Sequence, residues 1–194
     1  MKRICVFCAS SVGGDALYAD AVRALAIALV GRGIGVVYGG GSVGLMGVLA
    51  DTAVAAGGEV IGVIPRALAA KELAHSAITE LRLVESMHER KATMGALADA
   101  FVTLPGGLGT LEETFEVLTW SLLGIHRKPI GLLNVNGYWD PFLRLLSHTM
   151  REGFLRREFL GLLTLGETAD ELLDAIEAWT PPTLPRVWLD PSQT

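Results

Sequence analysis

Short runs of aliphatic and β-branched residues alternate along the chain with longer segments whose apolar residues recur at helical spacing. The short runs predict strands near residues 3–8, 34–38, 59–64, 81–84, 100–104, 129–134 and 162–165. The longer segments predict helices near residues 16–31, 44–56, 87–98, 110–123, 140–152 and 168–179. Most strand runs are apolar at consecutive positions, as expected for a parallel sheet that is covered on both faces. The pattern therefore predicts an α/β fold, doubly wound and Rossmann-like, with a mostly parallel sheet and helices on both faces.

The chain length of 194 residues suits one domain with a full-sized core. Because no repeat or linker divides the sequence, we expect a single domain over residues 1–180. Half of the eight prolines lie in the last fourteen residues, at Pro181, Pro182, Pro185 and Pro191. This cluster predicts an extended tail over residues 181–194.

Apolar residues make up 51% of the chain and charged residues only 19%, an excess that raises the question of a membrane span. The strongest apolar run, Ala24–Val30, is much shorter than the roughly 18 residues that a span needs. The N-terminal run Ile4–Ala9 is also too short for the core of a signal peptide. We therefore expect a cytoplasmic protein that does not contact a membrane.

The formal net charge is −5, and the basic residues are scattered along the chain. No basic stripe predicts contact with nucleic acid, although a few specific groups can still hold a single nucleotide. The two cysteines, Cys5 and Cys8, have C-x-x-C spacing, but residues so spaced in a strand point to opposite faces. We therefore expect two buried thiols, and no metal site is predicted, because no His cluster or second Cys pair completes one.

The first glycine-rich loop, residues 39–47, lies between a predicted strand and a predicted helix. Gly39, Gly41 and Gly44 fit the dinucleotide-binding pattern G-x-G-x-x-G, but no acidic residue ends the next strand to bind a ribose. No lysine follows the glycines, so a P-loop is also disfavoured. Two interpretations remain: backbone amides at a helix start that bind an anion, or a turn whose glycines permit positive φ and close packing.

The second glycine-rich loop reads Pro-Gly-Gly-Leu-Gly-Thr-Leu-Glu-Glu over residues 105–113, again between a strand and a helix. Its backbone amides and the Thr110 hydroxyl can cradle a phosphate at the helix N-terminus. The structural alternative is a capping box, in which Thr110 and Glu113 merely satisfy the helix start. Two acids, Glu112 and Glu113, exceed what a cap needs, and a carboxylate there lies about one helical turn from a bound phosphate. That distance brings the carboxylate within reach of a ribose.

A helix predicted to begin after Ser86, with Glu89 completing a capping box, carries two cations on its apolar stripe. These cations, Arg90 and Lys91, are unfavourable on an inward face unless they meet an anion there. The alternative is that their charged ends extend past the core to solvent or pair with local acids such as Glu85 or Glu89.

Taken in order, these motifs resemble the LOG ("lonely guy") family of cytokinin riboside 5′-monophosphate phosphoribohydrolases, formerly labelled possible lysine decarboxylases. The matching residues are Ser10-Ser11, Tyr38–Gly41, Gly44–Gly47, Met87-His88, Arg90-Lys91, Pro105–Gly107, Gly109-Thr110 and Glu112-Glu113. The resemblance implies hydrolysis of the N-glycosidic bond of AMP or an N6-substituted AMP to free base and ribose 5-phosphate. It also implies a homodimer and no cofactor.

The resemblance implies roles for individual residues as well. Arg90 and Glu113 would serve catalysis, and the glycine turn would hold the phosphate of the substrate. The expected substrate-binding residues are Glu72, Arg90, Lys91, Gly107, Leu108, Gly109, Thr110, Leu111, Glu112, Glu113 and Thr119, with Ser10, Ser11, Gly40, Gly41 and Met87 as additional candidates. Leu108 stands where an aromatic residue is frequent in the family, so the pocket wall is expected to differ there.

Two other functions remain open from the sequence. A non-catalytic carrier of a nucleotide or phosphorylated cofactor would share the fold and the glycine turns, but it would not need Glu113 together with Arg90. A pyridoxal-phosphate decarboxylase would need a lysine for its cofactor, and none stands in a recognisable context. A carboxylate beside the sugar suits the hydrolase best, because glycosidic cleavage passes through an oxocarbenium-like state.

Overall fold

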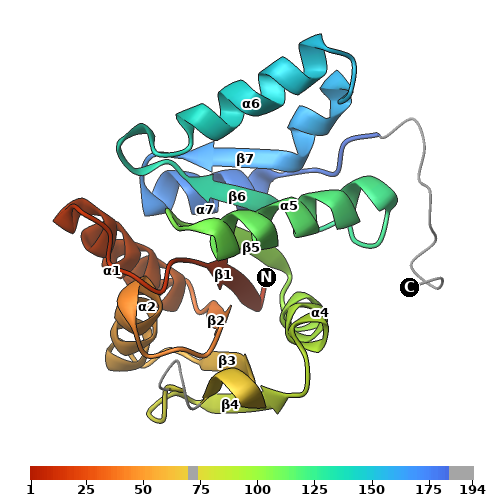
Figure 1. Cartoon of the computed structure of the whole chain (residues 1–194). Coiled ribbons are helices and arrows are strands. Elements are labelled where there is room, and N and C mark those ends of the chain that lie inside the picture. The colour runs from red at the N-terminus through yellow and green to blue at the C-terminus, as the bar shows by residue number, and fades with distance from the viewer. Residues whose placement is uncertain (70–73, 184–194) are drawn as a thin grey trace.

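The computed structural model describes residues 1–69 and 74–183, and it contains a seven-stranded parallel sheet with helices on both faces (Figure 1). The strands are β1 (Arg3–Phe7), β2 (Gly35–Tyr38), β3 (Val60–Pro65), β4 (Glu80–Val84), β5 (Ala100–Thr103), β6 (Ile130–Leu133) and β7 (Leu163–Gly166). The α-helices are α1 (Ala16–Gly31), α2 (Gly44–Ala55), α3 (Arg66–Ala69), α4 (Met87–Leu97), α5 (Leu108–Leu123), α6 (Asp140–Arg151) and α7 (Ala169–Ala178). Two short 3-10 helices are η1 (Val135–Gly137) and η2 (Arg157–Leu162).

The strand order is β4-β3-β2-β1-β5-β6-β7, and every neighbouring pair is parallel, which confirms the predicted fold class. From β1 the chain moves outward through β2 and β3 to β4, and then α4 carries it back to β5 on the other side of β1. The strand order therefore reverses between β1 and β5. In open α/β sheets, ligands bind at such a reversal, outside the carboxyl ends of the strands.

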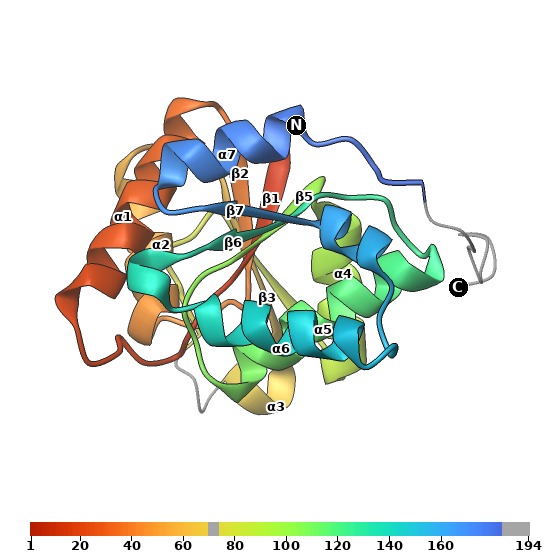
Figure 2. The same cartoon turned by 90° about the horizontal axis from the view of Figure 1, so that it is seen from above.

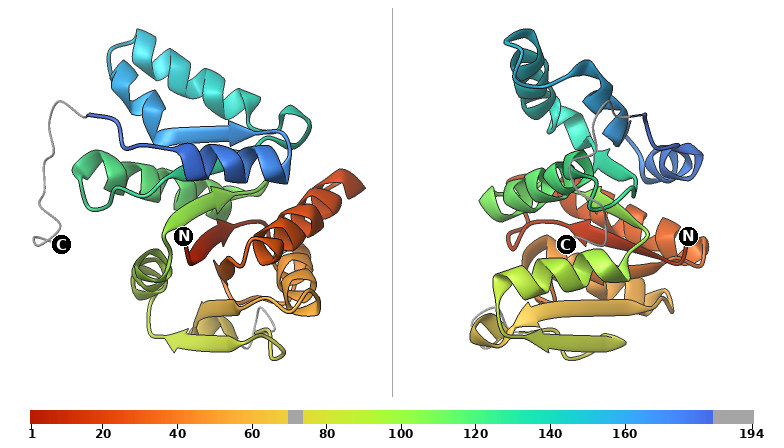
Figure 3. Two further views of the ribbon diagram at one scale, coloured as in Figure 1. Left: turned by 180° about the vertical axis from the view of Figure 1, so that it is seen from behind. Right: turned by 90° about the vertical axis from the view of Figure 1, so that its right-hand side faces the viewer.

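The helices divide between the two faces of the sheet (Figure 2). Helices α1, α2 and α7 pack on one face, where Leu25, Leu49 and Leu172 are fully buried. Helices α4, α5 and α6 pack on the other, where Met94 and Trp139 are almost fully buried. Helix α6 and η2 extend the second layer beyond the β7 edge of the sheet (Figure 3). This arrangement explains the apolar excess, because the strands are covered on both sides.

The two cysteines illustrate the two faces, as expected from their spacing. Cys5 belongs to the core beneath α4–α6, whereas Cys8 belongs to the core beneath α1, α2 and α7. Both are buried, unbonded thiols, so the prediction of two core thiols is confirmed.

The predicted strand boundaries agree with the structure to within one residue, and the predicted helices agree to within two. The sequence did not predict α3, η1 or η2, which are too short to show a helical period. The largest boundary difference is at α5, which begins at Leu108 rather than at Thr110. No helix in the described residues is long and apolar enough to cross a membrane. Of the predicted tail, only residues 181–183 are described, and the remainder lies outside the described residues.

Candidate active site

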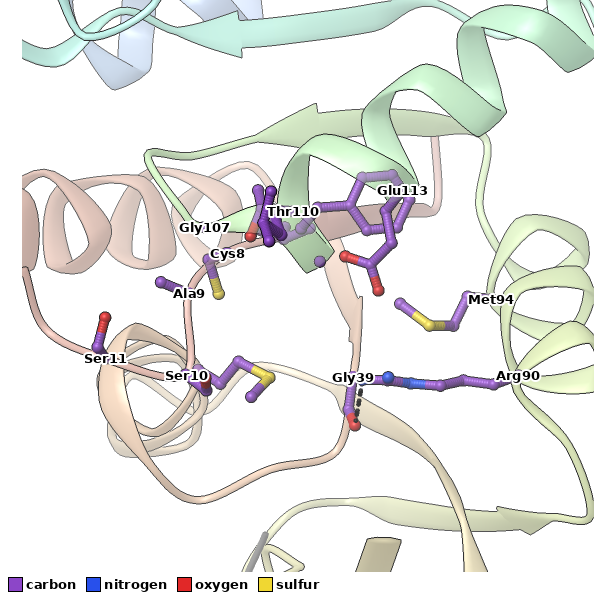
Figure 4. Close-up of a pocket in the computed structure, with 15 residues that line it drawn as sticks. Cys8, Ala9, Ser10, Ser11, Gly39, Arg90, Met94, Gly107, Thr110 and Glu113 are labelled. Atoms are coloured by element: carbon purple, nitrogen blue, oxygen red, sulfur yellow. Dashed lines mark hydrogen bonds between the residues drawn. The ribbon is translucent and has the colours of Figure 1, made fainter.

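A pocket opens at the carboxyl ends of β1, β2 and β5, at the reversal of the strand order (Figure 4). Its wall comes from the end of β1 and the loop after it, the end of β2, the inner side of α4, and the turn that begins α5. The residues that line it are Val6, Phe7, Cys8, Ala9, Ser10, Ser11, Gly39, Met46, Arg90, Met94, Gly107, Leu108, Gly109, Thr110 and Glu113. The fold thus brings the second glycine turn beside Arg90, although the two are well separated in sequence.

The N-terminus of α5 is open toward this pocket. Gly107 is the N-cap residue, and no side chain in the described part of the chain caps the helix. The Leu111 amide donates to the Gly107 carbonyl at 3.0 Å, so the amides of residues 108–110 precede the first intrahelical bond. Thr110 lies inside the first turn, so the structural alternative, a capping box of Thr110 with Glu113, is not formed. Exposed amides and the helix dipole together make this turn suited to an anion such as a phosphate.

The N-terminus of α2 is closed, although it too follows a glycine-rich loop. The Leu45 amide donates to the Ser11 carbonyl at 3.2 Å, and the Met46 amide donates to the Ala9 carbonyl at 3.3 Å. Gly44 has a φ of +61°, and a Cβ there would overlap the backbone of Ser10. The glycines of the first loop therefore serve close packing, and the structure favours that interpretation over an anion site at α2.

The α5 turn is held in place from the neighbouring loop and from within its own helix. The Tyr138 hydroxyl donates to the Gly106 carbonyl at 2.5 Å, and a Cβ at Gly106 would overlap Thr110. The Thr114 hydroxyl lies 2.6 Å from the Thr110 carbonyl and 3.2 Å from the Thr103 hydroxyl at the end of β5. These contacts fix the turn before any ligand arrives, which lowers the cost of binding.

Arg90 lies in the wall opposite the turn, and only 7% of the residue is exposed. Its Nε donates to the Val63 carbonyl at 3.1 Å, and its Nη2 donates to the Gly39 carbonyl at 3.0 Å (Figure 4). Its Nη1 lies 3.8 Å from Met87 Sδ. In the described residues, no carboxylate forms an ion pair with Arg90, so the positive charge is available to an anionic substrate.

Glu113 projects from α5 into the pocket toward Arg90 and Met94 (Figure 4). The pKa of the Glu113 carboxyl is raised to about 7. Burial is the main cause, Arg90 and Lys91 oppose the rise, and Glu112 and Glu116 add to it. A carboxyl with a pKa near neutrality can exchange a proton with a bound substrate or water. The pocket therefore contains one fixed cation and one carboxyl suited to general acid–base chemistry.

Lys91, the neighbour of Arg90, points to a different place. Its ammonium lies 2.6 Å from Glu112 Oε1 and 2.8 Å from Glu116 Oε1, both on α5. Among the described residues, Lys91 does not pair with Glu85 or Glu89, the local acids of the alternative interpretation. Arg90 and Lys91 thus leave the helix in different directions, with Arg90 lining the pocket and Lys91 crossing to α5.

The start of α4 differs slightly from the predicted capping box. The Ser86 hydroxyl accepts the Glu89 amide at 3.1 Å, as predicted. The Glu89 carboxylate, however, accepts the Glu85 amide at 2.7 Å, one residue before the N-cap. Both helix-end bonds are still made, so the start of α4 is well defined.

The pocket gathers half of the predicted site residues, namely Ser10, Ser11, Arg90, Gly107, Leu108, Gly109, Thr110 and Glu113. The others lie outside its wall: Gly40, Gly41, Met87, Lys91, Leu111, Glu112 and Thr119, the last of which lines an apolar groove between α5 and α6. Glu72 lies outside the described residues. Sequence reasoning missed Met46 and Met94 as wall residues, because buried methionines with helical spacing are indistinguishable from core residues.

Neither a metal nor a cysteine nucleophile is indicated by the described side chains. In the described ranges, no group of His, Cys, Asp and Glu side chains could hold a metal ion. Cys8 lines the pocket, but burial raises the pKa of its thiol far above the usual value, so the reactive thiolate is disfavoured. The polar groups that the described structure places at this pocket include Arg90, Glu113 and the α5 amides.

A family model described as "Possible lysine decarboxylase" matches residues 46–176. The rice (Oryza sativa subsp. japonica) protein "Probable cytokinin riboside 5'-monophosphate phosphoribohydrolase LOGL1" is 51% identical over 92% of this chain and 80% of its own. "Cytokinin riboside 5'-monophosphate phosphoribohydrolase LOG2" of Arabidopsis thaliana is 48% identical over 93% of this chain and 84% of its own.

Among solved structures, the molybdenum cofactor carrier protein of Chlamydomonas reinhardtii matches with a TM-score of 0.67 and 19% identity, over 91% of this chain and 96% of its own. The molybdenum cofactor binding protein of Rippkaea orientalis matches with a TM-score of 0.67 and 18% identity, over 92% of this chain and 97% of its own. Similarity at this level shows a shared fold only. The identity of about half with the phosphoribohydrolases extends over nearly the whole chain, and the chain therefore belongs to the LOG family, whose family model is described as possible lysine decarboxylase.

Proposed function

We propose that this protein hydrolyses the N-glycosidic bond of AMP or N6-substituted AMP and releases the free base and ribose 5-phosphate. The observation that carries the proposal is the placement of Glu113 and Arg90 on opposite walls of one pocket beside the open N-terminus of α5. Relatives that share about half of the residues are named for this reaction.

The phosphate of the nucleotide binds at the start of α5 in this proposal. The amides of Leu108, Gly109 and Thr110 point toward the open helix end, and the Thr110 hydroxyl adds a further donor. Since Glu113 lies one turn further along α5, a ribose whose 5′-phosphate is held there extends toward the Glu113 carboxyl. The helix thus orients the sugar by holding its phosphate.

Glu113 then acts on the anomeric carbon. The C1′–N9 bond breaks, its electron pair leaves with the base, and positive charge develops on the ribose. The ionised Glu113 carboxylate stabilises this charge and accepts a proton from the water that adds to C1′. Arg90 is held by the Gly39 and Val63 carbonyls. It orients the ribose or phosphate of the substrate and compensates the negative charge that develops in the reaction. The leaving base takes up a proton from solvent, and Glu113 returns the proton of the attacking water to solvent. One water is thus consumed, and the products are neutral base and ribose 5-phosphate.

The proposal also includes the other predicted substrate contacts. These are Lys91, Leu111, Glu112, Thr119 and Glu72, with Ser10, Ser11, Gly40, Gly41 and Met87 as additional candidates. The carrier function is less well supported, because binding alone does not require a carboxyl of raised pKa opposite an arginine. The molybdenum cofactor carrier protein of Chlamydomonas reinhardtii, at 19% identity, shows only that the fold is shared.

Incubation of the purified protein with AMP and with N6-isopentenyl-AMP, followed by chromatography of the released base, tests the proposal. Wild type is expected to release base from at least one of them, and Glu113→Gln is expected to bind the nucleotide without turnover. Nucleotide binding by wild type without release of any base would favour the carrier instead. A yellow preparation with a Schiff-base absorption band would favour the pyridoxal-phosphate enzyme.

We propose that the protein is a homodimer that associates through the groove between α5 and α6. Large apolar side chains line this groove, and several are exposed, among them Leu145 at 52% and Phe154 at 85%. Among the described residues of helix α6, Phe142 is the one that is buried in its own chain, and Leu143 and Leu146 are only partly buried against the core. Contiguous exposed apolar surface of this kind marks a protein interface.

Two further expectations are retained as proposals. Residues 1–180 form one nucleotide-binding hydrolase domain, with residues 181–194 as a tail. We also propose that the protein is cytoplasmic. Cell fractionation with an antibody against the protein tests the location.

A further inference from the structure

A cluster of three charged residues joins α4 to α5 beside the candidate active site. The Lys91 ammonium pairs with the carboxylates of Glu112 and Glu116, at 2.6 Å and 2.8 Å. Lys91 directly follows Arg90, and Glu113 lies between the two acids in sequence. Each helix therefore contributes one catalytic candidate to the pocket and at least one neighbouring residue to the cluster.

The two acids of the cluster are not equivalent. The Lys91 side chain is 10% exposed and the Glu116 side chain 20%, whereas the Glu112 side chain is 55% exposed. Exposed ion pairs contribute little because water and salt screen them, while a shielded pair is screened less. The pair with Glu116 is therefore screened less by solvent than the slightly shorter pair with Glu112. With two carboxylates around it, the Lys91 ammonium is already compensated without substrate.

The separation between Arg90 and Glu113 depends on how α4 and α5 are held together. Arg90 is fixed by the carbonyls of Val63 and Gly39, and Glu113 takes its position from α5. Within residues 1–69 and 74–183, the pairs of Lys91 are the only hydrogen bonds or ion pairs between side chains of these two helices. We propose that Glu116 is a positioning residue of the hydrolase site, which holds Lys91 against α5 and so sets the distance between Arg90 and Glu113. This inference rests on the proposed function.

The same cluster influences the charge of Glu113. The titratable groups that interact electrostatically with the Glu113 carboxyl are Arg90 and Lys91 from α4, Glu112 and Glu116 from α5, and the neutral thiols of Cys5 in β1 and Cys8 just after it. Glu116 raises the pKa of Glu113, and Lys91 lowers it. Loss of the Glu116 charge is therefore expected to lower the pKa of Glu113, and loss of the Lys91 charge to raise it. If the cluster only stabilised the fold, removal of the Glu116 charge and removal of the Lys91 charge would not shift the pKa of Glu113 in opposite directions.

The first test compares Glu116→Gln with wild type in base release over a range of pH. Glutamine keeps the length of the side chain but removes the charge, so we expect kcat to fall about tenfold and KM to change less than about threefold. The acidic limb of kcat/KM should move to lower pH in Glu116→Gln and to higher pH in Lys91→Met. The substrate phosphate titrates near about pH 6 in every variant, so differences between variants cancel its contribution.

Two further variants separate position from charge. Glu116→Asp keeps the charge on a shorter side chain, so we expect a lower kcat with the acidic limb unmoved. Glu158→Gln, at an exposed position in η2, is the matched control and should leave both quantities unchanged. Circular dichroism establishes that each variant is folded.

The outcomes distinguish this inference from the proposed function. If wild type releases no base, the proposed function fails. The pKa of Glu113 in each variant can still be obtained from the pH dependence of its unfolding free energy, with Glu113→Gln as the reference. If Glu116→Gln keeps kcat within about twofold of wild type, the positioning role is overturned, whether or not its acidic limb moves.

Discussion

Replacement of Glu113 by glutamine is expected to stabilise the folded protein at neutral and alkaline pH while it abolishes turnover. Burial raises the pKa of the Glu113 carboxyl in the folded state from 4.5 to about 7. Between these two values the folded protein holds a proton that the unfolded chain releases. Stability therefore falls as pH rises through this window, because the ionised carboxylate is less well solvated in the pocket than in the unfolded chain.

The size of the effect follows from the shift in pKa. At about 1.4 kcal/mol for each pH unit, a rise from 4.5 to about 7 sets an upper limit of about 3.5 kcal/mol on the destabilisation above pH 7. The Glu113 residue is only half-buried, so solvent screening reduces the expected value to about 1–3 kcal/mol. Glutamine has no charge at any of these pH values, so the variant should escape this loss.

Urea unfolding followed by circular dichroism at pH 5 and pH 8 measures the difference. Protein concentration must be the same in all samples, because association would otherwise change the apparent stability. Since part of the loss has already occurred at pH 5, the advantage of Glu113→Gln over wild type should grow by about 1–2 kcal/mol from pH 5 to pH 8. The exposed control Glu158→Gln should show no such growth. An advantage of Glu113→Gln that stays constant or shrinks as pH rises would refute the assignment of Glu113 as a buried, raised-pKa carboxyl.

Three further changes test other parts of the site and surface. Tyr138→Phe removes the donor to the Gly106 carbonyl, at a cost of about 1 kcal/mol, and should raise KM for the nucleotide about fivefold. The control is Tyr18→Phe, at a ring that packs edge-on against Tyr138, and it should leave KM unchanged. Gly39→Ala places a methyl group against the Arg90 guanidinium and should lower kcat/KM more than about tenfold. The control is Gly31→Ala, where the added methyl group meets open space, and its kcat/KM should match that of wild type. Leu145→Asp on the exposed face of α6 should convert a dimer into a folded monomer in light scattering at micromolar concentration, and a wild-type monomer would overturn the proposed interface.

The fold was predictable because each strand is apolar on both faces and each long helix has a clear period. Val36 and Val37 are both fully buried although they point to opposite sides of the sheet, so the run reads as a parallel strand. The start of α5 was less predictable, because Thr110 and Glu113 match a capping box that the structure does not form. Local motifs record which residues can cap a helix but not where tertiary contacts let the helix begin. Here Tyr138, from a distant loop, fixes the preceding turn.

The directions of Arg90 and Lys91 show a second limit of sequence reasoning. The helical stripe correctly indicated that these cations are shielded, since Arg90 is buried and the Lys91 side chain is largely so. Adjacent residues on a helix differ by about 100° in direction, so the two charges separate. Arg90 meets strand-end carbonyls, and Lys91 meets acids more than twenty residues away in sequence. Such partners depend on the packing of α4 beside α5, which periodicity in a single helix does not describe.

The two glycine-rich turns of this chain show that composition alone does not make an anion site. Both join a buried strand to a helix, and both present amides at the helix start. At α2 the loop after β1 covers the helix end, and the carbonyls of Ala9 and Ser11 bind the amides of Met46 and Leu45. At α5 no comparable segment of the described chain covers the end, so its amides remain open to the pocket. We therefore expect a ligand to bind where the strand order reverses and the neighbouring loop leaves the helix end uncovered. Under the proposed function, this position puts the substrate phosphate next to Glu113.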